Sequence, residues 1–342
     1  MYQFLKHTVL FSLITLCFVF LICEIKVSDH FIVYKTENTA YEKVAWNLNL
    51  INNQPKRIEN SIVFFGPSLV QGGICDSTLN ANDIKALNFG VNHFGNDLSL
   101  FFLKRIKHLK PKEVIFHKKK SSYSKLHKLT PLLYTPIELL KDGQRLNLYF
   151  LTYIFKRTAL VFEYLSLTSF DRIDTSYVPN YHFGVRYEKA TSYNILKPAK
   201  RDRTEMTNLH LNDFRFISER GNQSFSMKIK IYHRKWLHYL NYNSTLFNEN
   251  SQENFVNKAF EICSANDFRF SKIYIPEVGD LKNLENHKQT FYMNSDSDKN
   301  VICFKNFHFL NDSIYWADIH HLNKKGAISF TEELVNNLKQ SH

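Results

Sequence analysis

Short apolar runs alternate with helical patterns in this chain, and this alternation restricts the fold more than any other feature. Four runs, at 61–65, 85–90, 111–116 and 271–275, are each followed or closed by a glycine, proline or polar residue. Runs of this length with such boundaries are typical of buried strands. Between the second and third runs, residues 97–109 have apolar side chains at helical spacing. The order strand, helix, strand predicts an α/β fold with a central, mostly parallel sheet.

A serine stands directly after the first predicted strand. Gly66 and Pro67 end the run, and Ser68 follows them. In a parallel sheet, ligands bind beyond the carboxyl ends of the strands. Ser68 is therefore a candidate nucleophile.

A second polar block lies near the C-terminus, just before a predicted helix. Asp318 precedes His321 by three residues. A carboxylate can fix the tautomer and orientation of an imidazole, which then acts as a general base toward a serine. His320 competes for the role of base, and the three-residue spacing from Asp318 favours His321.

These two blocks resemble those of the SGNH hydrolases, also called GDSL esterases or lipases. In that family the nucleophilic serine follows the first strand, and an Asp-x-x-His block supplies the acid and the base. Here the last block is Asp318 to His321, extended by Leu322, Asn323 and Gly326. In the first block, Pro67 replaces the acidic residue that usually precedes the serine. The resemblance covers roughly residues 60–120 and 230–342.

The resemblance implies an SGNH-hydrolase-like three-layer sandwich and a Ser68, His321, Asp318 triad. More specifically, the chain is similar to membrane-anchored SGNH-like proteins of bacterial envelopes, some of which handle acyl groups on polysaccharides. A glycine after the second strand donates its N–H to the oxyanion in this family, and Gly90 holds the matching position. Gly90 can also simply form a turn. Asn92 lies in the same loop and is a candidate substrate-binding residue.

The family's third block departs from its pattern here. An asparagine that donates to the oxyanion should follow the third strand, but the sequence continues as 117–122 without one. Either Ser121, Ser122 or a lysine replaces that donor, or the oxyanion hole is incomplete. Removing one such donor typically costs about 10²–10³ in rate.

The N-terminus predicts a single membrane span. Residues 8–23 contain no charged side chain, and Ile25 and Val27 can extend this run. No small-residue cleavage site is present, so we expect an uncleaved anchor over 1–27; a signal peptide and a lipoprotein site are the alternatives. Residues 28–60 are interpreted as a stem. The resemblance places the body, 61–342, outside the cell membrane.

The chain is strongly basic, with a formal net charge of +12. A basic surface favours anionic surroundings, here an anionic or acylated glycan or the membrane surface. No nucleic-acid-binding motif is present, so nucleic acid is not expected as a partner. The basic stretches 117–120 and 197–203 are interpreted either as solvated loops or as an electropositive lip for an anionic substrate.

The middle of the chain, at about 125–230, is interpreted as an insertion into the α/β domain. Residues 145–165 are dense in Leu, Phe and Tyr but are interrupted by Lys156 and Arg157. A helix packed on the body is expected here, and a helix lying on the membrane is the alternative.

The cysteines and histidines show no metal-ligand spacing, so no cofactor is expected. Outside the N-terminal segment, Cys75, Cys263 and Cys303 are far apart and are interpreted as buried small side chains, although one disulfide among them is possible.

The expected function is ester chemistry on acyl esters of an envelope polysaccharide, with acetyl as the expected acyl group. The acyl group would pass from Ser68 to water in an esterase, or to a sugar hydroxyl in an O-acyltransferase. The alternatives are a catalytically inactive protein that binds glycan or a membrane partner, and an esterase that acts on lipids at the bilayer.

Overall fold

The chain folds around a five-stranded sheet. The computed structural model describes residues 2–37, 39–93, 95–117, 126–169, 251–277, 292–294, 308–316 and 321–340. The strand order is β2-β1-β3-β4-β5, in which the first four are parallel and β5 is antiparallel to β4. The strands are β1 (Ile62–Phe65), β2 (Ala86–Asn88), β3 (Glu113–His117), β4 (Arg269–Ile273) and β5 (Tyr292–Asn294). The predicted α/β class and mostly parallel sheet are confirmed.

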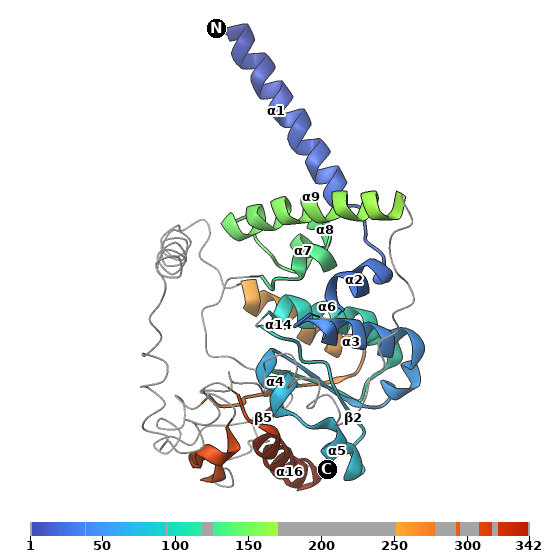
Figure 1. Cartoon of the computed structure of the whole chain (residues 1–342), viewed down its shortest axis with the longest axis vertical. Helices are drawn as coiled ribbons and strands as arrows, with labels where there is room; N and C mark the ends of the chain where they lie inside the picture. Colours follow the sequence, from blue (N-terminus) through green and yellow to red (C-terminus); the bar gives the residue numbers. More distant parts are fainter. Residues whose placement is uncertain are drawn as a thin grey trace.

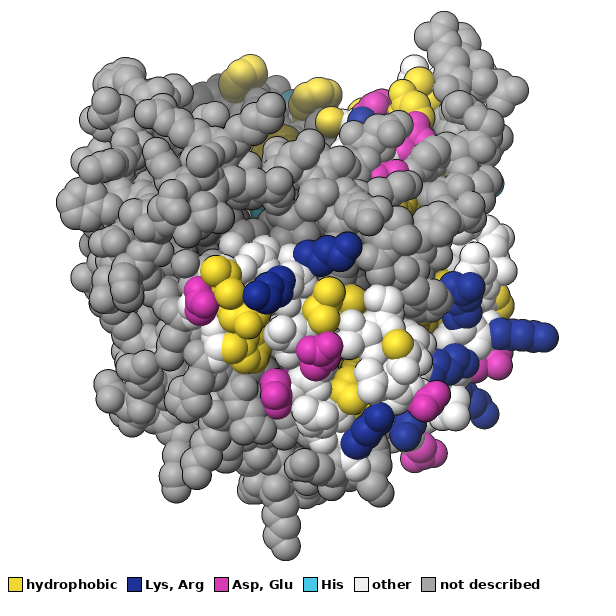
Figure 2. Space-filling model, turned by 60° about the horizontal axis from the view of Figure 1, so that its bottom comes forward, with side chains coloured by type: hydrophobic (Ala, Val, Ile, Leu, Met, Phe, Trp, Pro, Cys, Tyr) yellow, Lys and Arg dark blue, Asp and Glu magenta, His cyan; other side chains and the backbone are white. Residues whose placement is uncertain are grey.

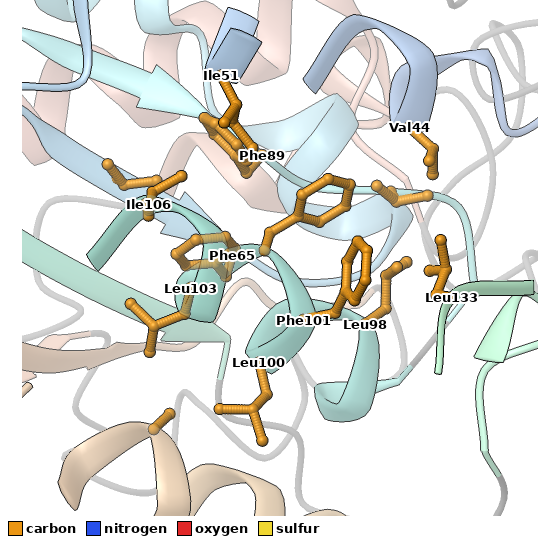
Figure 3. Packing of buried hydrophobic residues seen from close by; sticks show 14 of the residues in the cluster. Val44, Ile51, Phe65, Phe89, Leu98, Leu100, Phe101, Leu103, Ile106 and Leu133 are labelled. Carbon is orange, nitrogen blue, oxygen red and sulfur yellow. The ribbon is translucent and has the colours of Figure 1, made fainter. Parts of the chain in front are cut away.

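Helices cover both faces of the sheet. The helices on one face are α2 (Asp29–Thr36), α3 (Glu42–Asn53), α6 (Asn96–Ile106) and α14 (Ser251–Ser264). Those on the other face are α4 (Ser68–Gly73), α5 (Asp76–Ala81) and α16 (Lys324–Gln340). Within β1, Val63 and Phe65 point into the first layer, and Ile62 and Phe64 into the second. Figure 3 shows the first layer, where Phe65 and Phe89 pack among side chains of α3 and α6.

The chain reverses its direction across the sheet between β1 and β3. The connection from β1 to β2 runs through α4 and α5 on one face, and that from β2 to β3 runs through α6 on the other. After β1 the chain enters α4 on one face, whereas α14, which leads into β4, lies on the other face. In open α/β sheets, such a point of reversal is the place where ligands bind.

Residues 28–60 do not form the expected stem. They fold into α2, α3 and a 3₁₀ turn (Pro55–Arg57), and Phe31, Val44 and Leu48 are buried in the core. Apolar side chains at 44, 48 and 51 recur at helical spacing, so one face of α3 can pack on the body. This segment is part of the α/β body.

The N-terminal helix projects from the body (Figure 1). Helix α1 (Tyr2–Cys23) is the one described helix that is long and apolar enough to cross a membrane, and almost all of it is exposed. Helices α7 (Thr130–Leu133), α8 (Pro136–Lys141) and α9 (Leu148–Ser169) lie between α1 and the sheet, with α9 crosswise at the base of α1. The rest of the predicted insertion, from 170 to 230, lies outside the described residues. The remaining 3₁₀ turns are Lys107–Leu109, His308–Asn311 and Ser313–Tyr315.

Candidate active site

Ser68 and His321 meet at the carboxyl edge of the sheet. The Oγ of Ser68 lies 2.8 Å from Nε2 of His321, across 253 positions of sequence. Ser68 is the first residue of α4, and His321 lies on the loop before α16. Both side chains are half-buried, so a reactant can reach them from solvent. The contact is of the kind that lets an imidazole remove a proton from a serine.

The turn between β1 and Ser68 is packed too tightly for any side chain at Gly66. A Cβ there would lie 2.5 Å from Cγ2 of Val70 and 2.7 Å from Cβ of His117. Pro67 then supplies the carbonyl that accepts from the N–H groups of Val70 and Gln71 and opens α4. The glycine thus allows β1, β3 and α4 to approach one another where Ser68 begins its helix.

The residues that directly follow His321 are held by backbone and side-chain contacts. Leu322 is buried and forms an isolated antiparallel bridge with Trp316. Asn323 caps α16, because its Oδ1 accepts from Gly326 N–H at 2.9 Å. The Nδ2 of Asn323 donates to the carbonyls of Ile314 and Trp316. His321 is therefore followed directly by two residues, Leu322 and Asn323, that are held in place by the rest of the protein.

Asn88, at the end of β2, ties the sheet to α4. Its Nδ2 donates to the carbonyls of Val70 (2.7 Å) and Ile74 (2.8 Å), and the side chain is fully buried. These bonds hold the helix that presents Ser68, so Asn88 is a positioning residue. Asn88 was not among the residues predicted for the site, although it stands only two positions before Gly90 in the sequence.

Gly90 lies directly against α4. A Cβ at this position would be 2.5 Å from the backbone nitrogen of Gln71, so the close approach requires glycine. Its N–H donates to Oδ1 of Asn88 at 2.8 Å. The N–H therefore has a partner within the protein, and its use as an oxyanion donor stays a prediction that requires a change of partner.

Asn92 is also held by the protein. Its Nδ2 donates to the carbonyl of Ala40, in the α2–α3 connection, and its own carbonyl contacts Nε2 of His127 at 2.6 Å. Its role in substrate binding stays a prediction as well.

His117 occupies the carboxyl end of β3, next to the turn that leads to Ser68. It is 3% exposed, its ring stacks near that of Tyr274, and Ile275 N–H donates to its Nε2 at 3.4 Å. The buried side chain is thus part neither of a solvated loop nor of an electropositive lip, the two interpretations given for 117–120. Lys118, Lys119 and Lys120 lie outside the described residues.

Several predicted residues cannot be placed. Asp318, His320, Ser121, Ser122 and Cys303 lie outside the described residues, as does the basic stretch 197–203. Cys75 and Cys263 are buried and free. In the part of the chain that the structure describes, no group of three or more His, Cys, Asp or Glu side chains could hold a metal ion.

The end of the body opposite α1 carries charges of both signs. Figure 2 shows that, over the described part of this face, Lys and Arg side chains are interspersed with Asp and Glu. The described surface in this view therefore has no continuous basic patch.

Comparison with known proteins gives no relative, since no family model, no curated protein and no solved structure matches this chain.

Proposed function

We propose that this protein is a membrane-anchored SGNH-like esterase or O-acyltransferase that acts on acyl esters of an envelope polysaccharide. The observation that carries the proposal is the 2.8 Å contact between Ser68 Oγ and His321 Nε2, at the reversal point of a parallel sheet. The three-layer sandwich with helices on both faces of the sheet fits the same family. Asp318 is proposed as the carboxylate that orients His321, because it precedes the imidazole by three residues.

The chemistry follows from the order of these groups. His321 Nε2 takes the hydroxyl proton of Ser68 as Oγ attacks the acyl carbonyl, and the carbonyl oxygen becomes an oxyanion. The imidazolium then gives this proton to the departing sugar oxygen, which leaves an acyl group on Ser68. Water or a second sugar hydroxyl attacks the acyl carbon, His321 takes the proton of the attacking group, and Ser68 is regenerated when that proton returns to Oγ.

The oxyanion needs hydrogen-bond donors close to Ser68. The first N–H groups of a helix have no partner within the helix. In α4, Val70 and Gln71 donate to Pro67, so we assign the N–H of Ser68 as the first donor. Gly90 is the second donor if its N–H turns from Asn88 toward the ligand.

The proposed setting is the cell membrane, with α1 as a single span and the body on the outer side. A basic chain with a net charge of +12 suits an acylated or anionic glycan as partner, and nucleic acid is not proposed. The reaction requires no cofactor, because the serine and the imidazole supply nucleophile and base.

The decisive experiment combines covalent labelling with turnover. A serine-directed phosphonate should label wild-type Ser68 and should not label His321→Ala, because the base that activates the hydroxyl is gone. Acetylated glycan is offered with water alone and with a second glycan as acceptor, so that a transferase is not mistaken for a dead esterase. Turnover in Ser68→Ala would contradict the proposed mechanism.

A catalytically inactive glycan-binding protein is the second candidate. Two observations favour it: the N–H of Gly90 is bonded to Asn88, and no asparagine follows β3 in the sequence. If the purified protein neither labels nor turns over any acetyl ester while it still binds glycan, this second function holds.

A further inference from the structure

The outward face of α9 is apolar. The described residues outside α1 include nine exposed large hydrophobic side chains, and seven of them lie between positions 137 and 165. On α9 the most exposed are Phe155 (77%), Leu151 (56%) and Phe162 (53%). An exposed apolar patch on one element marks a contact with a membrane or a protein.

The body packs against the opposite face of α9 and leaves the apolar face uncovered. The buried residues of α9 are Phe150, Tyr153, Arg157 and Val161, which recur at helical spacing. Tyr153 donates its hydroxyl to the carbonyl of Tyr134 beneath the helix. The side chains at 151, 155 and 162 therefore point away from the body.

The base of α1 is fixed to the middle of α9. Arg157 donates from Nε to the carbonyl of Cys23 at 3.1 Å and from Nη2 to the carbonyl of Ile25. Cys23 Sγ lies 3.1 Å from Oγ1 of Thr158. In Figure 1, α9 lies between α1 and helices α7 and α8, so its outward face points to the side from which α1 projects.

We infer that the outward face of α9 lies in the headgroup–acyl boundary of the bilayer that α1 crosses. This inference rests on the membrane anchor in the proposed function. The exposed apolar surface of α1 ends at Cys23, so the membrane surface must pass at this level, and α9 is fixed there. Helices with Phe and Leu on one face bind lipid in this way.

The charges around α9 suit a membrane surface. Lys156 is exposed on α9 next to Phe155, and Lys141, the last residue of α8, is exposed as well. Two acidic side chains of this region are in ion pairs, Glu138 with Lys26 at 2.7 Å and Glu163 with Lys35 at 2.8 Å, and Glu24 accepts from the N–H of Ile137 at 2.8 Å. Exposed lysines beside an apolar face favour anionic headgroups.

Fluorescence quenching in the full-length protein tests this inference. The chain is placed in nanodiscs of phosphatidylcholine and phosphatidylglycerol, with an environment-sensitive thiol probe at Phe155→Cys and with Cys17 and Cys303 replaced by serine. The matched control is the probe at Phe260→Cys, an exposed aromatic position on α14. A second preparation keeps Cys17 as the labelled position, because Cys17 is exposed on α1.

We expect nitroxide-labelled lipid to remove most of the fluorescence at position 155 and at Cys17, but little at position 260. Aqueous iodide should act in the reverse order. If the probe at Cys17 is in lipid while that at position 155 is quenched by iodide, the inference fails and the anchor stands. If both are in water, the anchor itself fails. Protection at position 155 from both quenchers would mean that protein, such as a second copy, covers the face.

Discussion

A Cβ on Gly326 would lie 2.1 Å from the carbonyl oxygen of Tyr315, so α16 and the turn before it pack at a distance that only glycine permits. The same carbonyl accepts from Asn323 N–H at 2.9 Å, next to His321. We predict that Gly326→Ala displaces this loop and lowers the free energy of unfolding by about 1–3 kcal/mol. Phosphonate labelling of Ser68 should fall with it, measured beside thermal unfolding.

Gly73→Ala is the matched control for this change. A Cβ at Gly73 would meet Ile275 at 3.4 Å, which is an ordinary contact, and alanine is the better helix former. This variant should keep both its stability and its labelling. Equal losses in the two variants would contradict the role given to Gly326.

Asn323 should contribute to the start of α16 in two separable ways, through the hydrogen bond that its Oδ1 accepts and through those that its Nδ2 donates. Asn323→Asp keeps the acceptor for Gly326 N–H but loses the two bonds that Nδ2 donates to Ile314 and Trp316. Asn323→Ala loses both parts and should cost roughly 0.5–2 kcal/mol for the cap alone. We expect alanine to lower the unfolding midpoint more than aspartate does, while both reduce labelling of Ser68. If the phosphonate labels Ser68 in Asn323→Asp as strongly as in the wild type, the bonds that Nδ2 of Asn323 donates do not position His321.

Ser68 and His321 should act as one unit. Ser68→Ala and His321→Ala should each lower kcat on the order of 10⁴-fold or more, and the double variant should be little worse than either. Asp318→Asn should be less severe than loss of the serine, although still large, because the imidazole loses its orienting partner. His320→Ala is the control and should be mild. Additive losses in the double variant would show that the two residues do not share a step.

His127 should make the fold sensitive to acid. Burial lowers its pKa below 6.5, beyond the opposing effect of Asp97, and nearby Lys128 lowers the pKa further. Its Nδ1 accepts from Leu129 N–H, which needs an unprotonated nitrogen, while Nε2 donates to Asn92. As pH falls below about 6.5, the unfolded chain binds a proton at His127 before the folded protein does, so the free energy of unfolding decreases.

His127→Gln isolates this effect from the other ionisable side chains nearby, which include Asp97, Lys128, His93 and Tyr41. Glutamine can still donate to the carbonyl of Asn92 but does not titrate. Urea unfolding at about pH 7.5 and about pH 5.5 should show a smaller loss for this variant than for the wild type. An equal loss would assign the acid sensitivity to other groups.

Arg157 should be needed to hold α1 to the body. Its guanidinium is 1% exposed and donates to carbonyls of Cys23 and Ile25 on one side and of Pro131 and Leu132 on the other. Arg157→Met leaves these buried carbonyls without that donor, at about 1–3 kcal/mol for each group left unsatisfied. We expect lower thermal stability and faster proteolysis between α1 and α2, with Lys156→Met, an exposed neighbour, as the control. An unchanged rate of proteolysis in Arg157→Met would contradict the proposal that Arg157 holds α1 to the body.

The sequence predicted the parts of the fold that local patterns encode. The apolar runs located four of the strands to within a few residues, since a buried parallel strand must be apolar on both faces. Glycine and proline after β1 marked the turn at Ser68, and the three-residue spacing to Asp318 selected His321. The fold brings Ser68 and His321 together, which no local pattern could show.

The missed features depend on contacts between distant segments. Residues 28–60 are mixed in character and end in the polar stretch 52–57, so they suggested a stem. Within α3, however, even Glu42, Lys43, Asn47 and Asn49 are buried. The sequence pattern could not single out Asn88, because its partners are the backbone carbonyls of Val70 and Ile74. Every residue has a backbone carbonyl, so such partners leave no mark in the sequence. Burial of a polar side chain can be judged only when its partners are known.

The hydrogen bonds from Arg157 to the end of α1 limit where the body can lie relative to a membrane that α1 crosses. A flexible stem would let the body sweep a volume above the bilayer, but α2 and α3 belong to the core and leave no such stem. If α1 spans the membrane, α4 and Ser68 stay at a constant height, on the far side of α3 and α6 from α9 (Figure 1). Ser68 would then act only at this fixed distance from the bilayer. It could reach ester bonds on polymer that extends away from the membrane, but not ester bonds at the lipid surface.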